Sequence, residues 1–275
     1  MVEKFLRTAY YDIGKAGQHM YVLPHPLLRP YIAHYTAIFA GGEQQTDTLT
    51  LIPDASGCMI FTVQDGAVRA TAYGPMTKTA VVKNDIGTCP MRLFVEFLPG
   101  GMAHFVQEQQ EALADTRPEL DVLNRRVSCG VVQAMERERD FRGFIQAVDQ
   151  ILLSELERSR AVPAPLTMAL AEIGRTHGTA PVKRLSETSF YSARHLNRLF
   201  NTYIGMNAKT FSRLVRINYA VSLLKTGNSS LTAFAQQAGF FDQAHFIREF
   251  ETVCGTAPSK YRDNLSEFYN EPLKF

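Results

Sequence analysis

The sequence lacks any run of about 18 apolar residues, the length that a helix needs to cross a bilayer. Its first twenty residues also lack the apolar stretch of a secretory signal. Cysteine is scarce, and no Cys-x-x-Cys pair or cysteine–histidine spacing typical of zinc occurs among Cys58, Cys89, Cys129 and Cys254. We therefore expect a cytoplasmic protein with reduced thiols and no membrane contact. A redox-sensing cysteine stays open as an alternative.

Sequence patterns typical of catalysis are also missing. There are no paired carboxylates, no nucleophile elbow and no phosphate-binding loop. A metal-dependent β-barrel enzyme needs clustered histidines and a carboxylate, and His19, His25, His34 and His104 form no such cluster. We predict no enzyme activity, no catalytic residue, no metal site and no cofactor.

The length and composition indicate two globular domains. The chain has 275 residues, of which 45% are hydrophobic and 20% are charged. Its net charge is only +2, yet the segment 164–262 holds twelve Lys and Arg residues against five Asp and Glu residues. A basic C-terminal part beside an acidic remainder favours binding to a phosphate backbone.

A repeat with a shift of 50 residues is the strongest internal signal. It relates 182–211 to 232–261 without a gap. The identical pairs are Phe190/Phe240, His195/His245, Arg198/Arg248, Phe200/Phe250, Thr202/Thr252 and Gly205/Gly255. Two copies are too few for a solenoid, so we interpret them as a duplicated small module.

Each copy predicts a helix, a tight turn and a second helix. The first helices are expected at about 181–187 and 231–238, with Ser189 and Gly239 in the turns. Ser192 and Asp242 carry the side-chain oxygens that cap a helix start. Gly205 and Gly255 suit the left-handed position after a helix end. This order is that of a helix-turn-helix unit.

The second helix of each copy divides into an apolar face and a polar face. In the first copy, the spacing places Leu196, Leu199, Phe200 and Tyr203 in the core. The other face carries Arg194, Asn197, Arg198 and Asn201, and arginine and asparagine can pair with guanine and adenine edges. A merely solvated polar face is the alternative, which the duplicated context disfavours.

The second copy follows the same division. Phe246, Phe250 and Val253 are predicted to be buried, while Gln243, Ala244, Ile247 and Arg248 face elsewhere. His195 and His245 stand at matching positions just inside each helix. Both a packing or backbone-bonded role and a DNA contact stay open for these two histidines.

A long, nearly buried helix is predicted between the copies, over 207–225. Nineteen helical residues span roughly 28 Å, and successive major-groove segments on one face of DNA lie about 34 Å apart. Such a helix could hold two DNA-reading units at neighbouring grooves. Arg213 and Arg216 on this helix either contact phosphates or are solvated.

The segments GFFDQAHFIREFETVCGTAPSKYR, at 239–262, and SFYSARHLNRLFNTYIGMNAKTF, at 189–211, resemble the signatures of AraC/XylS-type transcription regulators. The resemblance covers about 165–262. It implies a seven-helix, all-α DNA-binding domain whose two recognition helices enter adjacent major grooves of DNA that is often bent.

By position in the motif, the resemblance also implies a set of DNA contacts. Glu249 and Glu251 stand where the family often has basic residues, which predicts a weaker second unit. The implied DNA-binding residues are Arg194, Asn197 and Arg198 in the first unit, and Gln243, Ala244, His245 and Arg248 in the second.

The N-terminal part predicts a β-rich barrel or sandwich, because short β-prone runs alternate with turn signals. The expected strands are His19–Leu23, Tyr31–Ala40, Thr48–Ile52, Cys58–Gln64, Ala67–Tyr73, Ala80–Lys83 and Arg92–Leu98. A short helix is expected within 102–110. More loosely, this part resembles the cupin-like sensor domains that precede such DNA-binding domains.

A helix is expected at 131–157, followed by a proline-containing linker at 159–165. Its apolar stripe either packs on the chain's own β domain or forms a dimer interface. The predicted organisation is a β-rich sensor domain at 1–125, a connecting or dimerisation helix with linker at 126–163, and a double helix-turn-helix domain with a short tail at 164–275.

These observations predict a sequence-specific DNA-binding transcription regulator of α+β class. Double-stranded DNA is the expected partner. RNA polymerase, a small-molecule effector of unknown identity and a second copy of the chain are further candidates. Two alternatives stay open for the N-terminal domain: a protein-interaction module without a small-molecule ligand, or an enzyme.

Overall fold

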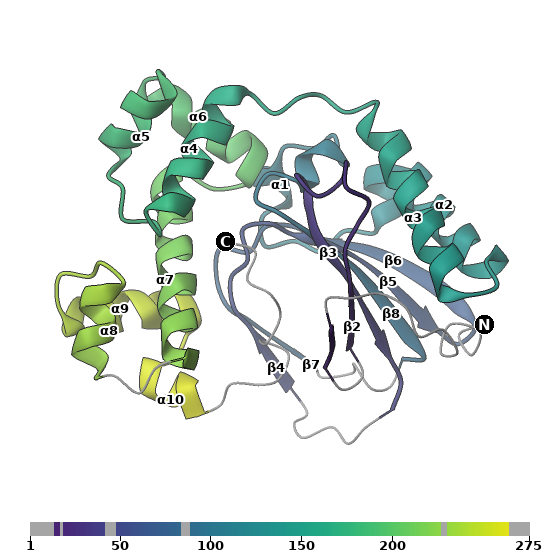
Figure 1. Cartoon of the computed structure of the whole chain (residues 1–275), viewed down its shortest axis with the longest axis horizontal. Helices are drawn as coiled ribbons and strands as arrows, with labels where there is room; N and C mark the ends of the chain where they lie inside the picture. The colour runs from purple at the N-terminus through teal and green to yellow at the C-terminus, as the bar shows by residue number, and fades with distance from the viewer. Residues whose placement is uncertain (1–13, 17–18, 42–47, 84–88, 227–229, 264–275) are drawn as a thin grey trace.

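The computed structural model describes residues 14–16, 19–41, 48–83, 89–226 and 230–263. An antiparallel β-sheet region with its own helices comes first, and an all-helical region follows (Figure 1). Within these described residues, no helix is long and apolar enough to cross a membrane. The predicted short tail after residue 263 lies outside the described residues.

The N-terminal region contains eight described strands. They are β1 (Gly14–Ala16), β2 (His19–Val22), β3 (Ile32–Phe39), β4 (Thr48–Leu51), β5 (Cys58–Gln64), β6 (Ala67–Tyr73), β7 (Ala80–Lys83) and β8 (Met91–Phe97). All seven predicted strands are present, with ends that differ by at most one residue, and the sequence reasoning missed only the three-residue β1. Asp65 and Gly66 both have positive φ, 49° and 79°, as a two-residue type I′ hairpin turn requires.

The strands form an open antiparallel sheet, not a closed barrel. The order is β1-β2-β3-β8-β5-β6, and a separate two-stranded sheet pairs β4 with β7. No pairing joins β1 to β6 among the residues that the structure describes. The predicted β-rich fold is therefore confirmed, while closure into a cupin-like barrel is not.

Two helices cover one face of this sheet: α2 (Leu120–Arg137) and α3 (Phe141–Leu156). The predicted single helix at 131–157 is thus wrong, because the chain breaks at 138–140 and Asp140 caps α3 by accepting a hydrogen bond from the Gly143 N–H at 2.8 Å. The apolar stripe of α3 lies in the same buried cluster as the strands. That stripe comprises Phe141, Phe144, Ile145, Val148 and Leu152. In this structure the stripe thus packs on the chain's own sheet.

A partly buried group of hydrogen bonds fixes α3 to the sheet. Asp149 of α3 accepts bonds from the Tyr35 hydroxyl at 2.8 Å and from the His25 N–H at 3.0 Å. Burial raises the pKa of the Asp149 carboxyl, and burial next to that carboxyl raises the pKa of the Tyr35 hydroxyl.

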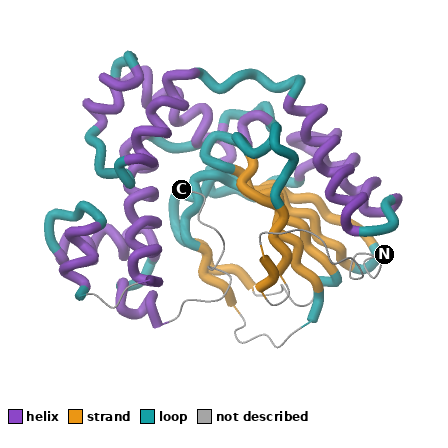
Figure 2. The backbone as a smooth tube through the Cα atoms, in the orientation of Figure 1, coloured by secondary structure: helices purple, strands orange, loops and turns teal. Residues whose placement is uncertain are grey.

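The C-terminal region consists of seven helices within the described residues. They are α4 (Ala164–Arg175), α5 (Val182–Ser189), α6 (Ala193–Ile204), α7 (Ala208–Thr226), α8 (Leu231–Gln237), α9 (Gln243–Cys254) and α10 (Pro258–Asp263). Figure 2 shows that this half is helices and loops, with the strands confined to the other half. The chain from 157 to 163 has no regular structure, in agreement with the predicted linker.

The long helix α7 stands between the two helix-turn-helix units (Figure 1). It has 19 residues, as predicted, and Phe211, Leu214 and Ile217 on it are at most 2% exposed. Its apolar side chains belong to one buried cluster that also holds α4, α6 and α9. Ala55, from the N-terminal region, is 1% exposed within the same cluster, so the two regions are in contact.

Candidate nucleic-acid interface

The first helix-turn-helix unit consists of α5 and α6. Ser192 caps α6 because its Oγ accepts a hydrogen bond from the His195 N–H at 3.3 Å. Gly205 ends the helix with φ of +85°, and its N–H bonds to the carbonyl oxygens of Phe200 and Asn201. The predicted start and end of this recognition helix are confirmed.

The second unit, α8 and α9, is built in the same way. The Asp242 Oδ1 accepts a bond of 2.6 Å from the His245 N–H, and Gly255 ends the helix with φ of +68°. The duplicated sequence thus produces duplicated caps.

The two turns differ in structure, although the sequence repeat aligns Phe190 with Phe240. The left-handed residue is Phe190 in the first unit, at φ of +59°, and Gly239 in the second, at φ of +76°. The left-handed residue stands two positions before the capping residue Ser192 in the first unit and three positions before Asp242 in the second. The Phe190 side chain is consequently 86% exposed, while Phe240 is buried at 5%. The prediction that Ser189 makes this turn is wrong, because Ser189 is the last residue of α5.

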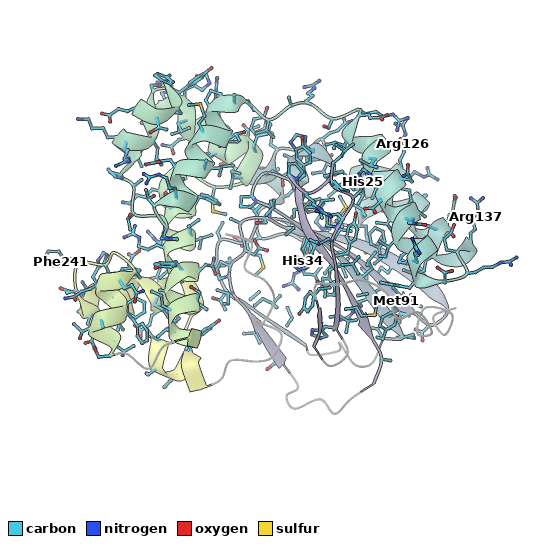
Figure 3. All side chains as sticks on the ribbon, viewed as in Figure 1. His25, His34, Met91, Arg126, Arg137 and Phe241 are labelled. Carbon is cyan, nitrogen blue, oxygen red and sulfur yellow. The ribbon has the colours of Figure 1, made fainter. Side chains whose placement is uncertain are left out.

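Phe241 is the other exposed aromatic at these turns, with 90% of its surface accessible. Figure 3 shows it at the outer edge of the second unit, on the opposite side of the molecule from Arg126 and Arg137 of α2. Sequence reasoning did not single out Phe190 or Phe241 as exposed. Their exposure depends on the conformation of the turns, which the spacing of apolar residues in the sequence does not indicate.

The apolar face of each recognition helix is buried as predicted. Leu196 and Phe200 of α6 are fully buried, and Leu199 and Tyr203 pack beside them. In α9 the predicted core residues Phe246, Phe250 and Val253 are all at most 4% exposed. The opposite face of each helix therefore carries its solvent-exposed side chains.

Two predicted contact residues of α6, Arg194 and Arg198, have exposed side chains. The third, Asn197, is half-buried, and its Oδ1 accepts a 3.0 Å bond from the Ala208 N–H at the start of α7. A bidentate pairing of Asn197 with adenine would have to use the second lone pair of this oxygen or break the bond to Ala208.

In α9, Ala244 and Arg248 are exposed. Gln243 is half-buried, and its Oε1 accepts a hydrogen bond of 2.8 Å from the Thr232 hydroxyl of α8. The helix α9 therefore has one exposed arginine, compared with two on α6.

Both histidines make contacts inside their own units. His195 lies edge-on to the Tyr191 ring, with centroids 4.4 Å apart, and its Nε2 is 3.4 Å from the Arg198 guanidinium. The His245 Nδ1 accepts a 3.4 Å bond from the Phe241 N–H. The packing or backbone-bonded role is thus observed for both, and a DNA contact by His245 stays a prediction.

The two arginines of α7 are held by the protein. Arg213 pairs with Glu249 of α9 at 3.0 Å, and the Arg216 guanidinium lies 5.3 Å from the centre of the Phe240 ring. Burial lowers the pKa of the Arg216 guanidinium. One alternative from the sequence was that Arg213 and Arg216 are simply solvated. The structure shows both of them in contact with protein groups instead.

A charged cluster joins α4 to α5 beside the first unit. Glu172 contacts the guanidinium groups of Arg175 at 2.8 Å and Arg184 at 2.6 Å. The hydrogen bond from Arg175, aided by Arg184, lowers the pKa of the Glu172 carboxyl to about 2. This cluster fixes the first helix of the unit without occupying the recognition helix.

The described part of the chain contains no group of three or more His, Cys, Asp or Glu side chains arranged to hold a metal ion. What the geometry offers instead is two capped helices with exposed arginines, mounted on one long helix. A helix, a turn and a capped second helix are the elements of a helix-turn-helix DNA-binding domain.

Comparison with known proteins identifies the family. Residues 185–264 match the model of a helix-turn-helix domain family, and residues 20–119 match a model described only as a domain of unknown function. A probable transcription factor of Proteus vulgaris, PqrA, is 31% identical over 83 residues, which are 30% of this chain and 68% of that protein. The chain belongs to the AraC/XylS-type family of helix-turn-helix transcription regulators.

A longer match is to an uncharacterized HTH-type transcriptional regulator of Haemophilus influenzae. It is 26% identical over 162 residues, which are 59% of this chain and 51% of the relative. The chain thus spans about half the length of this relative. Among solved structures, ToxT from Vibrio cholerae superposes with a TM-score of 0.40 and 12% identity, covering 84% of this chain and 97% of that one.

Proposed function

We propose that this protein is a sequence-specific DNA-binding transcription regulator whose α6 and α9 enter successive major-groove segments of one duplex. The observation that carries the proposal is the duplication itself. Two recognition helices with the same caps and the same buried face are attached to the single helix α7. One continuous duplex offers matching grooves at about one-turn intervals.

The exposed charges support the same conclusion. Arg194 and Arg198 lie on α6 and Arg248 lies on α9, and all three are exposed at the solvent face of the units. Arginine can pair with two acceptors of guanine in the major groove or with a backbone phosphate. The DNA-binding residues of this proposal are Arg194, Asn197, Arg198, Gln243, Ala244, His245 and Arg248.

For the N-terminal domain, we propose effector sensing as the role that its chemistry favours. His34, Thr36 and Glu96 are polar side chains that are at most 6% exposed. His34 pairs with Glu96 in the register of β3 and β8. A sheet face with buried polar groups suits recognition of a small polar molecule better than a flat apolar protein contact. RNA polymerase contact and dimerisation remain further candidates.

Selection from a random pool of double-stranded DNA tests the main proposal. The full chain, purified and used at near-physiological salt, is expected to recover an asymmetric motif of two short boxes about one helical turn apart. The Arg198→Ala/Arg248→Ala double variant should lose the motif. Arg137→Ala, which changes an arginine of α2 on the opposite side of the molecule, is the matched control (Figure 3).

Recovery of fragments without a shared motif, bound only through a salt-sensitive and sequence-independent attraction, would contradict sequence-specific recognition.

A further inference from the structure

The N-terminal domain touches the end of the second recognition helix. The Thr79 hydroxyl donates a hydrogen bond of 2.5 Å to the backbone carbonyl oxygen of Val253, in the last turn of α9. The last carbonyls of a helix have no partner within the helix, so an outside hydroxyl satisfies one of them. Thr79 also lies next to Gly255, the residue that ends α9.

The same domain touches the matching end of the first recognition helix. The short helix α1 (Gln110–Leu113) lies against α6. Gly205, which ends α6, is so close to the Gln110 carbonyl oxygen that an added Cβ would come within 2.8 Å of it. The Asn201 amide donates to Glu111 at 3.3 Å.

These two contacts come from one connected piece of the N-terminal domain, which we call the clasp and define as residues 74–79 together with 110–115. Asp115 ties its parts together. Its carboxylate accepts bonds from the Thr77 N–H at 2.9 Å and the Thr77 hydroxyl at 2.6 Å. The Asp115 N–H in turn donates to the Pro75 carbonyl at 3.0 Å.

The clasp therefore holds equivalent points of the two repeats, since Gly205 and Gly255 are separated by the repeat length of 50 residues. Each recognition helix has 12 residues, so its capped start lies about 18 Å from the end that the clasp holds. The ends facing the clasp are thus distant from the starts that approach DNA, and the clasp does not cover those starts.

We infer that Thr79 and Glu111 are positioning residues that fix the two recognition helices relative to each other, and so set the box spacing that the protein accepts. The inference rests on the proposed function. It adds that contacts from the N-terminal domain, together with α7, determine which spacing between the two DNA boxes the protein accepts.

The experiment measures affinity for DNA of altered spacing. The probes are the selected two-box duplex, the same duplex with one or two base pairs inserted between the boxes, and a duplex in which one box is scrambled. The proteins are the full chain, Thr79→Val, Glu111→Ala and Thr79→Ser. Thr167→Val, at an exposed threonine of α4, is the matched control.

Thr79→Val is expected to bind the selected duplex about 2- to 10-fold more weakly, the range of one lost hydrogen bond. Its affinity for the one-box duplex should equal that of the wild type. The penalty for an inserted base pair should be smaller than in the wild type, because a looser pair of helices adapts to more spacings. Glu111→Ala should act in the same direction, and Thr79→Ser should restore wild-type behaviour.

Two results would overturn the inference. If Thr79→Val and Glu111→Ala keep the wild-type dependence on spacing, the clasp does not position the helices. If either variant binds the two-box duplex more tightly, the clasp restrains the helices in an arrangement that disfavours DNA. If the wild type binds the two-box duplex no more tightly than the one-box duplex, the proposed function itself is wrong. Failure of the proposed function can thus be told apart from failure of this inference.

Discussion

The Arg213 Nε lies 3.0 Å from the Glu249 Oε2, so an ion pair joins the long helix α7 to the recognition helix α9. Glu249 is one of the two acidic residues expected to weaken the second unit. Its charge is partly offset by Arg213, whereas Glu251 on the same helix is exposed. The helix α9 therefore keeps one exposed acidic charge, whereas α6 contains no acidic residue.

We predict that Arg198→Ala reduces specific DNA affinity more than Arg248→Ala. Arg198 belongs to the unit with two exposed arginines on its recognition helix, and removing a base-contacting arginine costs about 1–3 kcal/mol. Arg248 shares its helix with Glu251, so its net attraction for phosphate is smaller. Gel-shift titrations at one fixed salt concentration measure the two losses, with Arg137→Ala as the control. Equal losses would show that the ranking of the two units is wrong.

Replacing Phe190 by glycine should stabilise the fold or leave it unchanged. A side chain in the left-handed region costs about 1–2 kcal/mol, and the Phe190 ring is 86% exposed and gains little from burial. Part of that gain is offset by the larger chain entropy of unfolded glycine. We expect the free energy of unfolding in urea to rise by up to about 1 kcal/mol.

Phe241→Gly is the matched control, because Phe241 is equally exposed but is not among the described residues with positive φ. A destabilised Phe190→Gly variant beside an unchanged Phe241→Gly variant would mean that the Phe190 ring stabilises the fold through contacts.

The Glu172 cluster predicts a pH-dependent contribution to stability. Because the folded state lowers the pKa of the Glu172 carboxyl to about 2, its stabilising effect is present above the ordinary glutamate pKa and is lost as the pH falls toward 2. Glu172→Gln should therefore be less stable than the wild type at pH 7, and the difference should shrink below about pH 4. Urea unfolding at pH 7, 4 and 3 measures this difference.

Glu187→Gln, at an exposed glutamate of α5, is the control for that series. A gap between wild type and Glu172→Gln that stays constant from pH 7 to pH 3 would exclude the ionised carboxyl as its source.

The four thiols should differ in reactivity by their exposure. Cys129 is exposed, whereas burial raises the pKa of the Cys254 thiol to about 12 and so suppresses its reactive thiolate. A thiol reagent at pH 7.5 should label Cys129 first, and Cys254 only after unfolding. Mass spectrometry of the labelled peptides gives the order. Fast labelling of Cys254 in a folded Cys129→Ser variant would contradict this order and would favour a redox-sensing role for Cys254.

Much of the DNA-binding domain could be predicted from the sequence because its signals are local. The caps Ser192 and Asp242, the ending glycines and the apolar spacing of α6 act within one or two helical turns. The turns were harder, since moving the left-handed residue by one position exposes Phe190 and buries Phe240. The break between α2 and α3 was missed for a similar reason, because both helices share one continuous apolar pattern.

By itself, the sequence determined the seven longer strands, where the recognition helices begin and end, and which of their faces carries arginine. These properties follow from local hydrogen bonding and from the spacing of apolar residues. Only the tertiary structure decided the partners of side chains far apart in the chain. It paired Arg213 with Glu249, used Asn197 to join α6 to α7, and placed Thr79 against Val253, 174 positions away. Such contacts arise when packed elements bring distant residues together, and no local pattern in the chain encodes them.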